Sequence, residues 1–142
     1  MDNYWSLLFY IHTISTAIMF GVIWIVQLVH YPSFHYIDRD RYSSFHSFHT
    51  KSISIFIIPI MLIEIGTGIG LFYVLKTIDI LFIFSFVCLL IIWMITGLFF
   101  SKMHRLLLIR YNKNIVNRII IFNWIRTILW SVRLVLLFVI FG

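Results

Sequence analysis

Histidines are the side chains of this 142-residue chain whose spacing most suggests chemistry. His46 and His49 are three residues apart, so a helix through them would place both imidazoles on one face. His30 and His104 each lie at the end of another apolar segment. Neutral imidazole is the commonest metal ligand in proteins, and helix bundles form metal sites from facing helices. We therefore expect a zinc, iron or copper site formed by His30, His46, His49 and His104.

The sequence leaves other interpretations of the histidines open. Imidazoles at helix ends are also typical of polar loops in the lipid head-group region, and one of them could be an axial haem ligand. His12 lies deeper, beside Thr13 and Ser15. It fits a hydrogen-bonded buried histidine, a haem ligand or a proton-relay group. The single cysteine, Cys88, excludes a disulfide or a cysteine-based cluster within the chain.

Ionisable and amide side chains also interrupt the apolar segments, and Glu64 and Arg133 are the most informative. A charge near the membrane centre costs about 2.5–3.5 kcal/mol on insertion scales, so such groups must face the bundle interior. At about 1.5 Å per residue, Glu64 and Arg133 lie about 18 Å and about 21 Å into their helices from the same membrane side. We predict that they pair, directly or through one water.

Two buried arginines face this one glutamate, which leaves an excess positive charge inside the bundle. Asn123, Arg126 and Arg133 fall on one face of the last apolar segment, and Gln27 lies near the end of the first. A carboxylate, a quinone oxygen or a phosphate would satisfy a free guanidinium. The predicted substrate-binding set is therefore Arg126, Arg133, Asn123, Gln27 and Glu64. The alternative is an internal network that only holds the helices in register.

Composition decides which elements must position these residues. Hydrophobic residues make up 62% of the chain and charged residues 11%, against about 45–50% and about 25% in soluble domains. This excludes a soluble globular domain and a disordered chain. Because a membrane helix needs about 20 apolar residues, the sequence predicts an all-α bundle of four transmembrane helices in a single domain, 1–142. The helices expected are about 4–31, 52–75, 80–101 and 119–141.

The connections between these helices predict the topology. We expect Pro32 to end the first helix, a polar loop over 33–51, a hairpin turn over 76–79 and a second polar loop over 102–118. The second connection carries one basic residue, Lys76. The first and third connections together carry eight basic residues: Arg39, Arg41, Lys51, Lys102, Arg105, Arg110, Lys113 and Arg118. The positive-inside rule then places both termini on the non-cytoplasmic side. The net charge of +6 reflects these loops, so no nucleic-acid partner is expected.

Four blocks of sequence resemble a family of small, uncharacterised bacterial four-helix membrane proteins. They are the segment from Trp24 to Pro32, the His46-x-x-His49 step, Pro59-x-Met61-Leu62-x-Glu64, and the segment from Asn123 to Arg133. The chain is more remotely similar to the anthrone-oxygenase-like membrane domain. It is also similar in size and layout to the HemJ type of protoporphyrinogen oxidase, which implies that His12 binds haem. Val26 and Gln27 stand roughly where that type has a Pro-Arg pair.

These features together give two functional hypotheses. The first is a metal- or haem-dependent redox protein of the bacterial cytoplasmic (inner) membrane, acting on a lipophilic or anionic small molecule. The second is a non-enzymatic membrane subunit or binding protein whose buried polar residues fix helix packing. The sequence assigns no catalytic residue, and it leaves open whether the chain is an enzyme. Its partners are the lipid bilayer and, as an open alternative, a second copy of itself or a membrane complex.

Overall fold

The computed structural model describes residues 3–75 and 79–141. Within these ranges all regular structure is helical. Four continuous helical segments are long and apolar enough to cross a membrane: Tyr4–Tyr36, Tyr42–Val74, Ile80–Ile109 and Lys113–Ile140. The predicted all-α fold with four helices able to span a membrane is therefore confirmed.

Two of the four segments change their helical pitch along their length. The first consists of α1 (Asn3–Ile25), the π-helical turn η1 (Val26–His30), α2 (Tyr31–Ser33) and the 3₁₀ turn η2 (Phe34–Tyr36). The second is α3 (Tyr42–Val74). The third consists of α4 (Ile80–Ile95), the π-helical turn η3 (Thr96–Phe100) and α5 (Ser101–Ile109), and the fourth is α6 (Lys113–Phe141).

The predicted helix ends at the two polar loops, 33–51 and 102–118, were wrong, because most of these residues are helical. The helices continue past the apolar runs, so that the connections shorten to residues 37–41 and 110–112. Helix formation requires hydrogen bonds and not apolar side chains, so a spanning helix can extend into the head-group region. Pro32 does not end the first segment: it lies at the start of α2, directly after the π turn η1, and the helical path continues to Tyr36.

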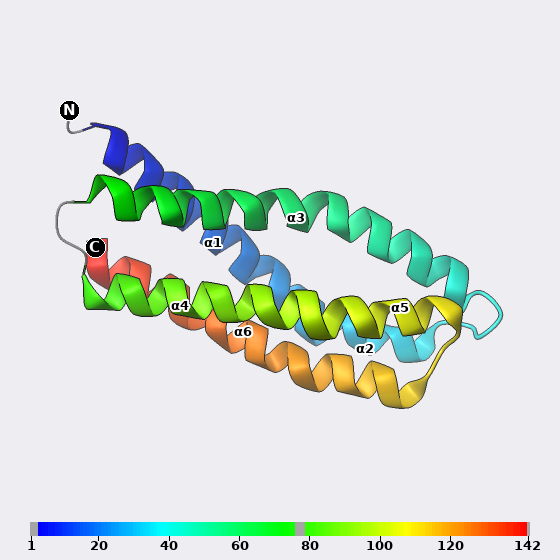
Figure 1. Ribbon diagram of the computed structural model, residues 1–142. Helices are drawn as coiled ribbons and strands as arrows, with labels where there is room; N and C mark the ends of the chain where they lie inside the picture. The colour runs from blue at the N-terminus through cyan, green and yellow to red at the C-terminus, as the bar shows by residue number, and fades with distance from the viewer. Residues whose placement is uncertain (1–2, 76–78, 142) are drawn as a thin grey trace.

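The bundle has two distinct ends (Figure 1). The N- and C-termini lie together at one end, and the connections 37–41 and 110–112 lie at the other, which we call the basic end. The predicted hairpin turn over 76–79 falls mostly on residues 76–78, outside the described residues. Helix α1 packs against α3 and α6, and α4 packs against α6.

Apolar and polar layers alternate along the bundle. Three buried apolar clusters are centred on Phe34 and Leu107 at the basic end, on Met19 and Trp130 in the middle, and on Leu71 near the termini. Along α1, α3 and α6 the middle cluster lies between two groups of buried polar side chains, one toward the termini and one toward the basic end. We refer to these two groups as the polar layers.

Gly68 of α3 lies against side chains of α1 and α4. A Cβ at this position would lie 2.8 Å from a ring carbon of Phe86 on α4 and 3.1 Å from a ring carbon of His12 on α1. A Cβ at Gly66, two residues earlier, would meet no atom within 4 Å. A side chain at Gly68 would therefore have to displace Phe86 or His12.

We predict that Gly68→Leu destabilises the protein, whereas Gly66→Leu does not. Overpacking of this kind costs about 1–3 kcal/mol, while the added side chain at Gly66 lies in open space. Thermal unfolding of the two variants in the same detergent measures the difference. Equal unfolding midpoints would contradict the packing described here.

Candidate functional site

The polar layer nearer the termini is centred on the predicted ion pair. Arg133 and Glu64 are both fully buried, and the guanidinium Nη1 contacts the carboxylate Oε1 directly. Thr16 Oγ1 donates to Glu64 Oε1 at 2.7 Å, and Trp130 Nε1 donates to Oε2 at 3.3 Å. The guanidinium also donates from Nε to the Ser85 carbonyl at 3.0 Å. The predicted Glu64–Arg133 pair is therefore confirmed, and both partners are used within the protein.

His12 belongs to this same layer. Its Nε2 lies 3.3 Å from Arg133 Nη2, and its Nδ1 lies 2.9 Å from the Glu64 carbonyl oxygen and 3.0 Å from Thr67 Oγ1. A guanidinium can only donate, so Nε2 is the acceptor and Nδ1 carries the proton. Both ring nitrogens therefore have protein partners. A haem iron at His12 Nε2 would have to replace the contact with Arg133.

The polar layer nearer the basic end contains the four predicted histidines. His30 Nε2 lies 2.6 Å from His49 Nδ1, and His104 Nδ1 lies 3.1 Å from His46 Nε2. Centroids of neighbouring rings are 4.2–6.0 Å apart. Tyr31 on α2 adds its hydroxyl, 3.3 Å from His104 Nε2. We refer to His30, His46, His49 and His104 as the histidine cluster.

Local structure explains how the histidine cluster forms. Helix α3 begins at Tyr42, so His46 and His49 lie on one helix face, as their spacing predicts. The π turns η1 and η3 end at His30 and Phe100, immediately before the chain resumes an α-helical pitch. Phe34 packs edge-on against three of the rings, with centroid distances of 5.2–5.3 Å. His35 is separate, with its Nδ1 2.8 Å from the Tyr111 hydroxyl.

The rings of the histidine cluster bind one another in this structure. Within residues 3–75 and 79–141, no three His, Cys, Asp or Glu side chains are already arranged as a ligand set for a metal ion. His46 Nδ1 is buried without a hydrogen-bond partner. Metal binding at the cluster would have to replace the two imidazole–imidazole hydrogen bonds.

Gln27 and Asn123 lie beside the histidine cluster and bind each other. Asn123 Nδ2 donates to Gln27 Oε1 at 2.9 Å, and Gln27 Nε2 donates to the Ile120 carbonyl at 3.2 Å. These two amides tie the first spanning segment to α6. Their contacts are of the kind that fix helix packing.

Arg126 is the buried cation that the protein does not neutralise. It is 4% exposed, and its Nε is buried without a hydrogen-bond partner. The Arg133–Glu64 contact is the one salt bridge among the described residues. The Arg126 guanidinium instead faces the rings of Phe100 at 4.3 Å and Trp130 at 5.4 Å. The two arginines predicted to share one face of α6 therefore differ in their charge environment, because Arg133 is neutralised by Glu64 and Arg126 is not.

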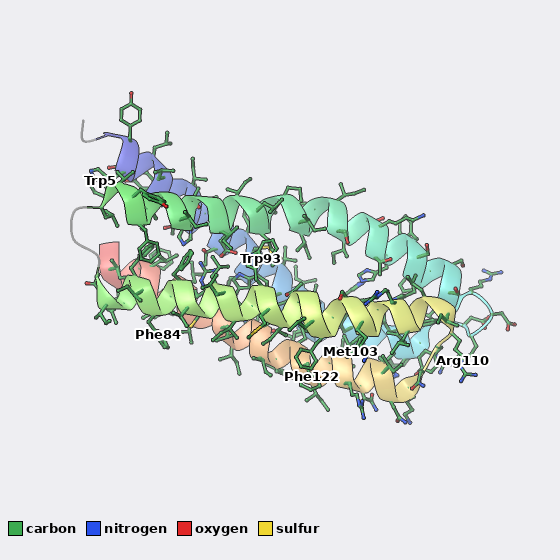
Figure 2. The ribbon with its side chains drawn as sticks, in the orientation of Figure 1. Trp5, Phe84, Trp93, Met103, Arg110 and Phe122 are labelled. Atoms are coloured by element: carbon green, nitrogen blue, oxygen red, sulfur yellow. The ribbon has the colours of Figure 1, made fainter. Side chains whose placement is uncertain are left out.

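A cavity of about 390 Å³ lies beside Arg126 and the histidine cluster. We call it the lateral pocket because exposed residues of α3 and η3, among them Ile58 and Gly97, form part of its wall. Figure 2 labels Trp93, another wall residue, in the region between α3 and α4. The pocket is lined by Tyr31, His49, Thr50, Ile53, Ser54, Ile57, Ile58, Met61, Trp93, Thr96, Gly97, Phe100, Ser101, His104 and Arg126.

The sequence analysis missed the contribution of the third spanning segment to this pocket. Trp93 and Thr96 are three residues apart in a run without charges, so neither was considered a site residue. A tryptophan away from the membrane interfaces was the available signal, since interfacial belts are its usual place.

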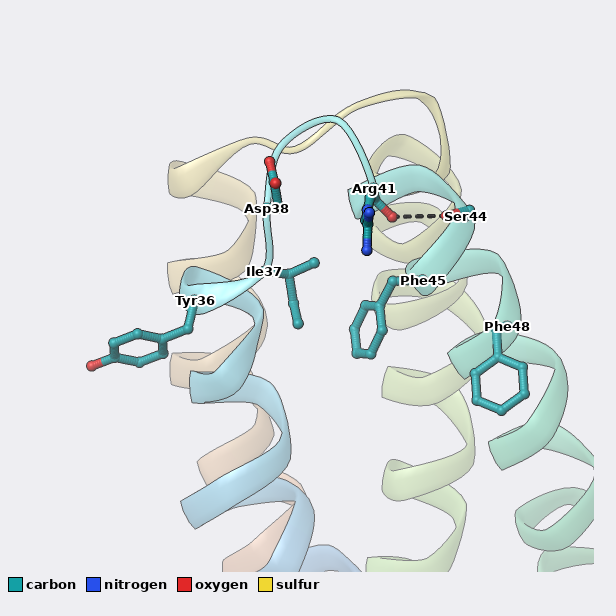
Figure 3. Close-up of a pocket in the computed structure, with 7 residues that line it drawn as sticks. All are labelled: Tyr36, Ile37, Asp38, Arg41, Ser44, Phe45 and Phe48. Atoms are coloured by element: carbon teal, nitrogen blue, oxygen red, sulfur yellow. Dashed lines mark hydrogen bonds between the residues drawn. The ribbon is translucent and has the colours of Figure 1, made fainter.

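A second hollow, of about 500 Å³, lies at the basic end (Figure 3). It is formed by the connection 37–41 and the start of α3, and its polar side chains are Asp38, Arg41 and Ser44. Ser44 Oγ donates to the Arg41 carbonyl at 2.9 Å. This hollow contains none of the predicted site residues, and we assign no chemistry to it.

Comparison of the chain with protein-family models, curated proteins and solved structures found no significant match.

We predict that Glu64→Ala strongly destabilises the protein, because it leaves Arg133 buried without a carboxylate. The expected loss in the free energy of unfolding is about 3–5 kcal/mol. Denaturant unfolding in detergent micelles measures it. Asp40→Ala also removes a carboxylate but from an exposed position, and should change stability by less than about 0.5 kcal/mol. Similar losses in both variants would contradict the role of the ion pair.

Proposed function

We propose that this protein is a membrane-embedded redox protein that acts on a lipophilic substrate and uses a transition metal held by the histidine cluster. The observation that carries this proposal is the convergence of four imidazoles from three spanning segments beside the lateral pocket. Two of these imidazoles, His49 and His104, line the pocket itself. A substrate in the pocket would therefore be next to the proposed metal.

The chemistry of the histidine cluster supports a metal site. Two histidine nitrogens bound to one metal at about 2.0–2.1 Å each are about 3 Å apart. The nitrogens of the two hydrogen-bonded pairs are separated by 2.6 Å and 3.1 Å. Each pair would become two ligands if both rings turned so that their nitrogens pointed at a metal ion instead of at each other. Imidazole ligands suit zinc, copper and iron, and of these copper and iron supply electron transfer.

The location of the metal site follows from the charge asymmetry of the chain. We infer that the basic end faces the cytoplasm of a bacterial cell and that both termini face the opposite side of its inner membrane. The basic residues of both connections support this orientation. The histidine cluster would then lie in the cytoplasmic half of the membrane.

A second candidate is a non-enzymatic membrane subunit or binding protein. The observation that favours it is the internal satisfaction of the Glu64–Arg133 layer, together with the mutual hydrogen bonds of the imidazoles. In that case the histidines would contribute to stability in the absence of any metal.

Metal analysis tests the first candidate. We predict that protein purified in a mild detergent contains a transition metal, and that the double variant His46→Ala/His104→Ala loses it while remaining folded. His35→Ala is the control, because His35 binds Tyr111 outside the cluster. Elemental analysis and titration of chelator-treated protein with Zn²⁺, Fe²⁺ or Cu⁺ give the metal content. Absence of metal binding, or its persistence in the double variant, would refute the metal site. A lower unfolding midpoint of the double variant than of metal-free wild-type protein would favour the second candidate.

Cysteine labelling tests the orientation. In a Cys88→Ser background, we predict that Asp40→Cys and Asn112→Cys react with a membrane-impermeant maleimide in inside-out vesicles and not in intact spheroplasts. Both positions lie in the connections at the basic end. Labelling in intact spheroplasts would place the basic end outside.

A further inference from the structure

We propose that the lateral pocket binds a single-chain lipophilic carboxylate, with its carboxylate at Arg126 and its chain along the apolar wall. The carboxylate would be the substrate of the proposed redox function, and its role as a substrate rests on that function. It is carried by the cavity and by the donors that the protein leaves without partners.

The first part of the argument is the charge of Arg126. A buried cation is stable only when it is paired. The described carboxylates cannot serve, because Glu64 is bound to Arg133 and Asp38, Asp40 and Asp79 are exposed. The rings of Phe100 and Trp130 cover the guanidinium but supply no negative charge. An anion from outside the chain would complete the pair.

The second part is the set of other donors around the same cavity. Trp93 Nε1 and Thr96 Oγ1 both belong to residues that line the pocket, and both atoms are buried without a hydrogen-bond partner. Indole nitrogen can only donate, so Trp93 requires an acceptor. The Tyr31 hydroxyl also belongs to the pocket lining, but it already has a partner in His104 Nε2. The Arg126 guanidinium, the Trp93 indole and the Thr96 hydroxyl together call for a head group with several acceptor sites.

A carboxylate meets these requirements best. Its two oxygens accept about four hydrogen bonds and match the two-pronged geometry of a guanidinium. Its single negative charge equals the single positive charge of Arg126. A quinone oxygen would accept hydrogen bonds but leave the cation unneutralised. The carboxylate is therefore favoured over a neutral head group.

The remaining wall of the pocket suits a hydrocarbon chain. It contains Ile53, Ile57, Ile58 and Met61 of α3, opposite Gly97 of η3. A volume of about 390 Å³ lies within the usual range of small-molecule sites. Ile58 is 51% exposed on the lipid-facing surface, so the pocket can be entered from the bilayer. One chain and one small head group fit this shape.

Quenching of tryptophan fluorescence by a brominated ligand tests the proposal. Chelator-treated protein in phosphatidylcholine nanodiscs is titrated with dibromostearic acid and, separately, with its methyl ester, which has the same chain but no charge. We expect saturable quenching by the acid and at least about tenfold weaker binding of the ester, because the ester cannot form the charged pair. Trp93→Phe should lower the saturable signal, because Trp93 belongs to the pocket wall. The remaining saturable signal should come from Trp130, whose ring centroid lies 5.4 Å from the Arg126 guanidinium.

Matched variants assign the binding to Arg126 and to the pocket. Arg126→Gln should abolish saturable quenching, whereas Arg118→Gln, which removes an exposed cation from the same helix, should retain it. Gly97→Leu should also abolish it by filling the pocket. A Cβ at Gly97 meets no atom within 4 Å, so this variant should fold even if Arg126→Gln does not. Equal quenching by acid and ester, or unchanged quenching in Gly97→Leu, would overturn the proposal.

The use of metal-free protein separates this proposal from the proposed function. Carboxylate binding without any metal binding would refute the redox function and leave the carboxylate site intact. Metal binding at the histidine cluster without carboxylate binding would refute the carboxylate site and leave the metal site intact.

Discussion

A charge buried in a membrane protein must be paired, because the hydrocarbon interior of the membrane supplies no counter-charge. Glu64 and Arg133 meet this requirement through their direct contact and through hydrogen bonds from Thr16, Trp130 and Arg133 itself. The contacts join α1, α3, α4 and α6, so one polar layer fixes the relative depth of all four spanning segments. The second polar layer is then held at a set distance by the apolar cluster around Met19 and Trp130.

The difference between the two arginines of α6 follows from this arrangement. They are seven residues apart on one helix face, yet one has a carboxylate partner and the other faces aromatic rings beside a cavity. A buried pair is common in a packing role, but an unpaired buried cation is costly to maintain. Among the described residues, Arg126 is the one buried cation without a carboxylate partner, and it lies next to the imidazoles.

Much of this architecture could be predicted from the sequence. The apolar runs predicted four spans, the matching depths predicted the Glu64–Arg133 pair, and the spacing of His46 and His49 predicted their common helix face. The helix ends could not be predicted, because a helix such as α3 continues into polar sequence once its hydrogen-bond ladder is established. The lateral pocket could not be predicted either. It depends on which donors, such as those of Trp93 and Thr96, remain without partners after packing, and this is a property of three-dimensional arrangement alone.

The two π turns have a geometric consequence for the histidine cluster. Each holds one more residue per turn than an α-helix, as the bonds from the Tyr31 and Ser101 amides to the carbonyls five residues earlier indicate. The extra residue changes the register of the helix that follows it. A change of register by one residue turns a side chain by about 100° about the helix axis. His30 and His104 lie at or just beyond these turns, so their ring directions are set by backbone register as well as by side-chain rotation.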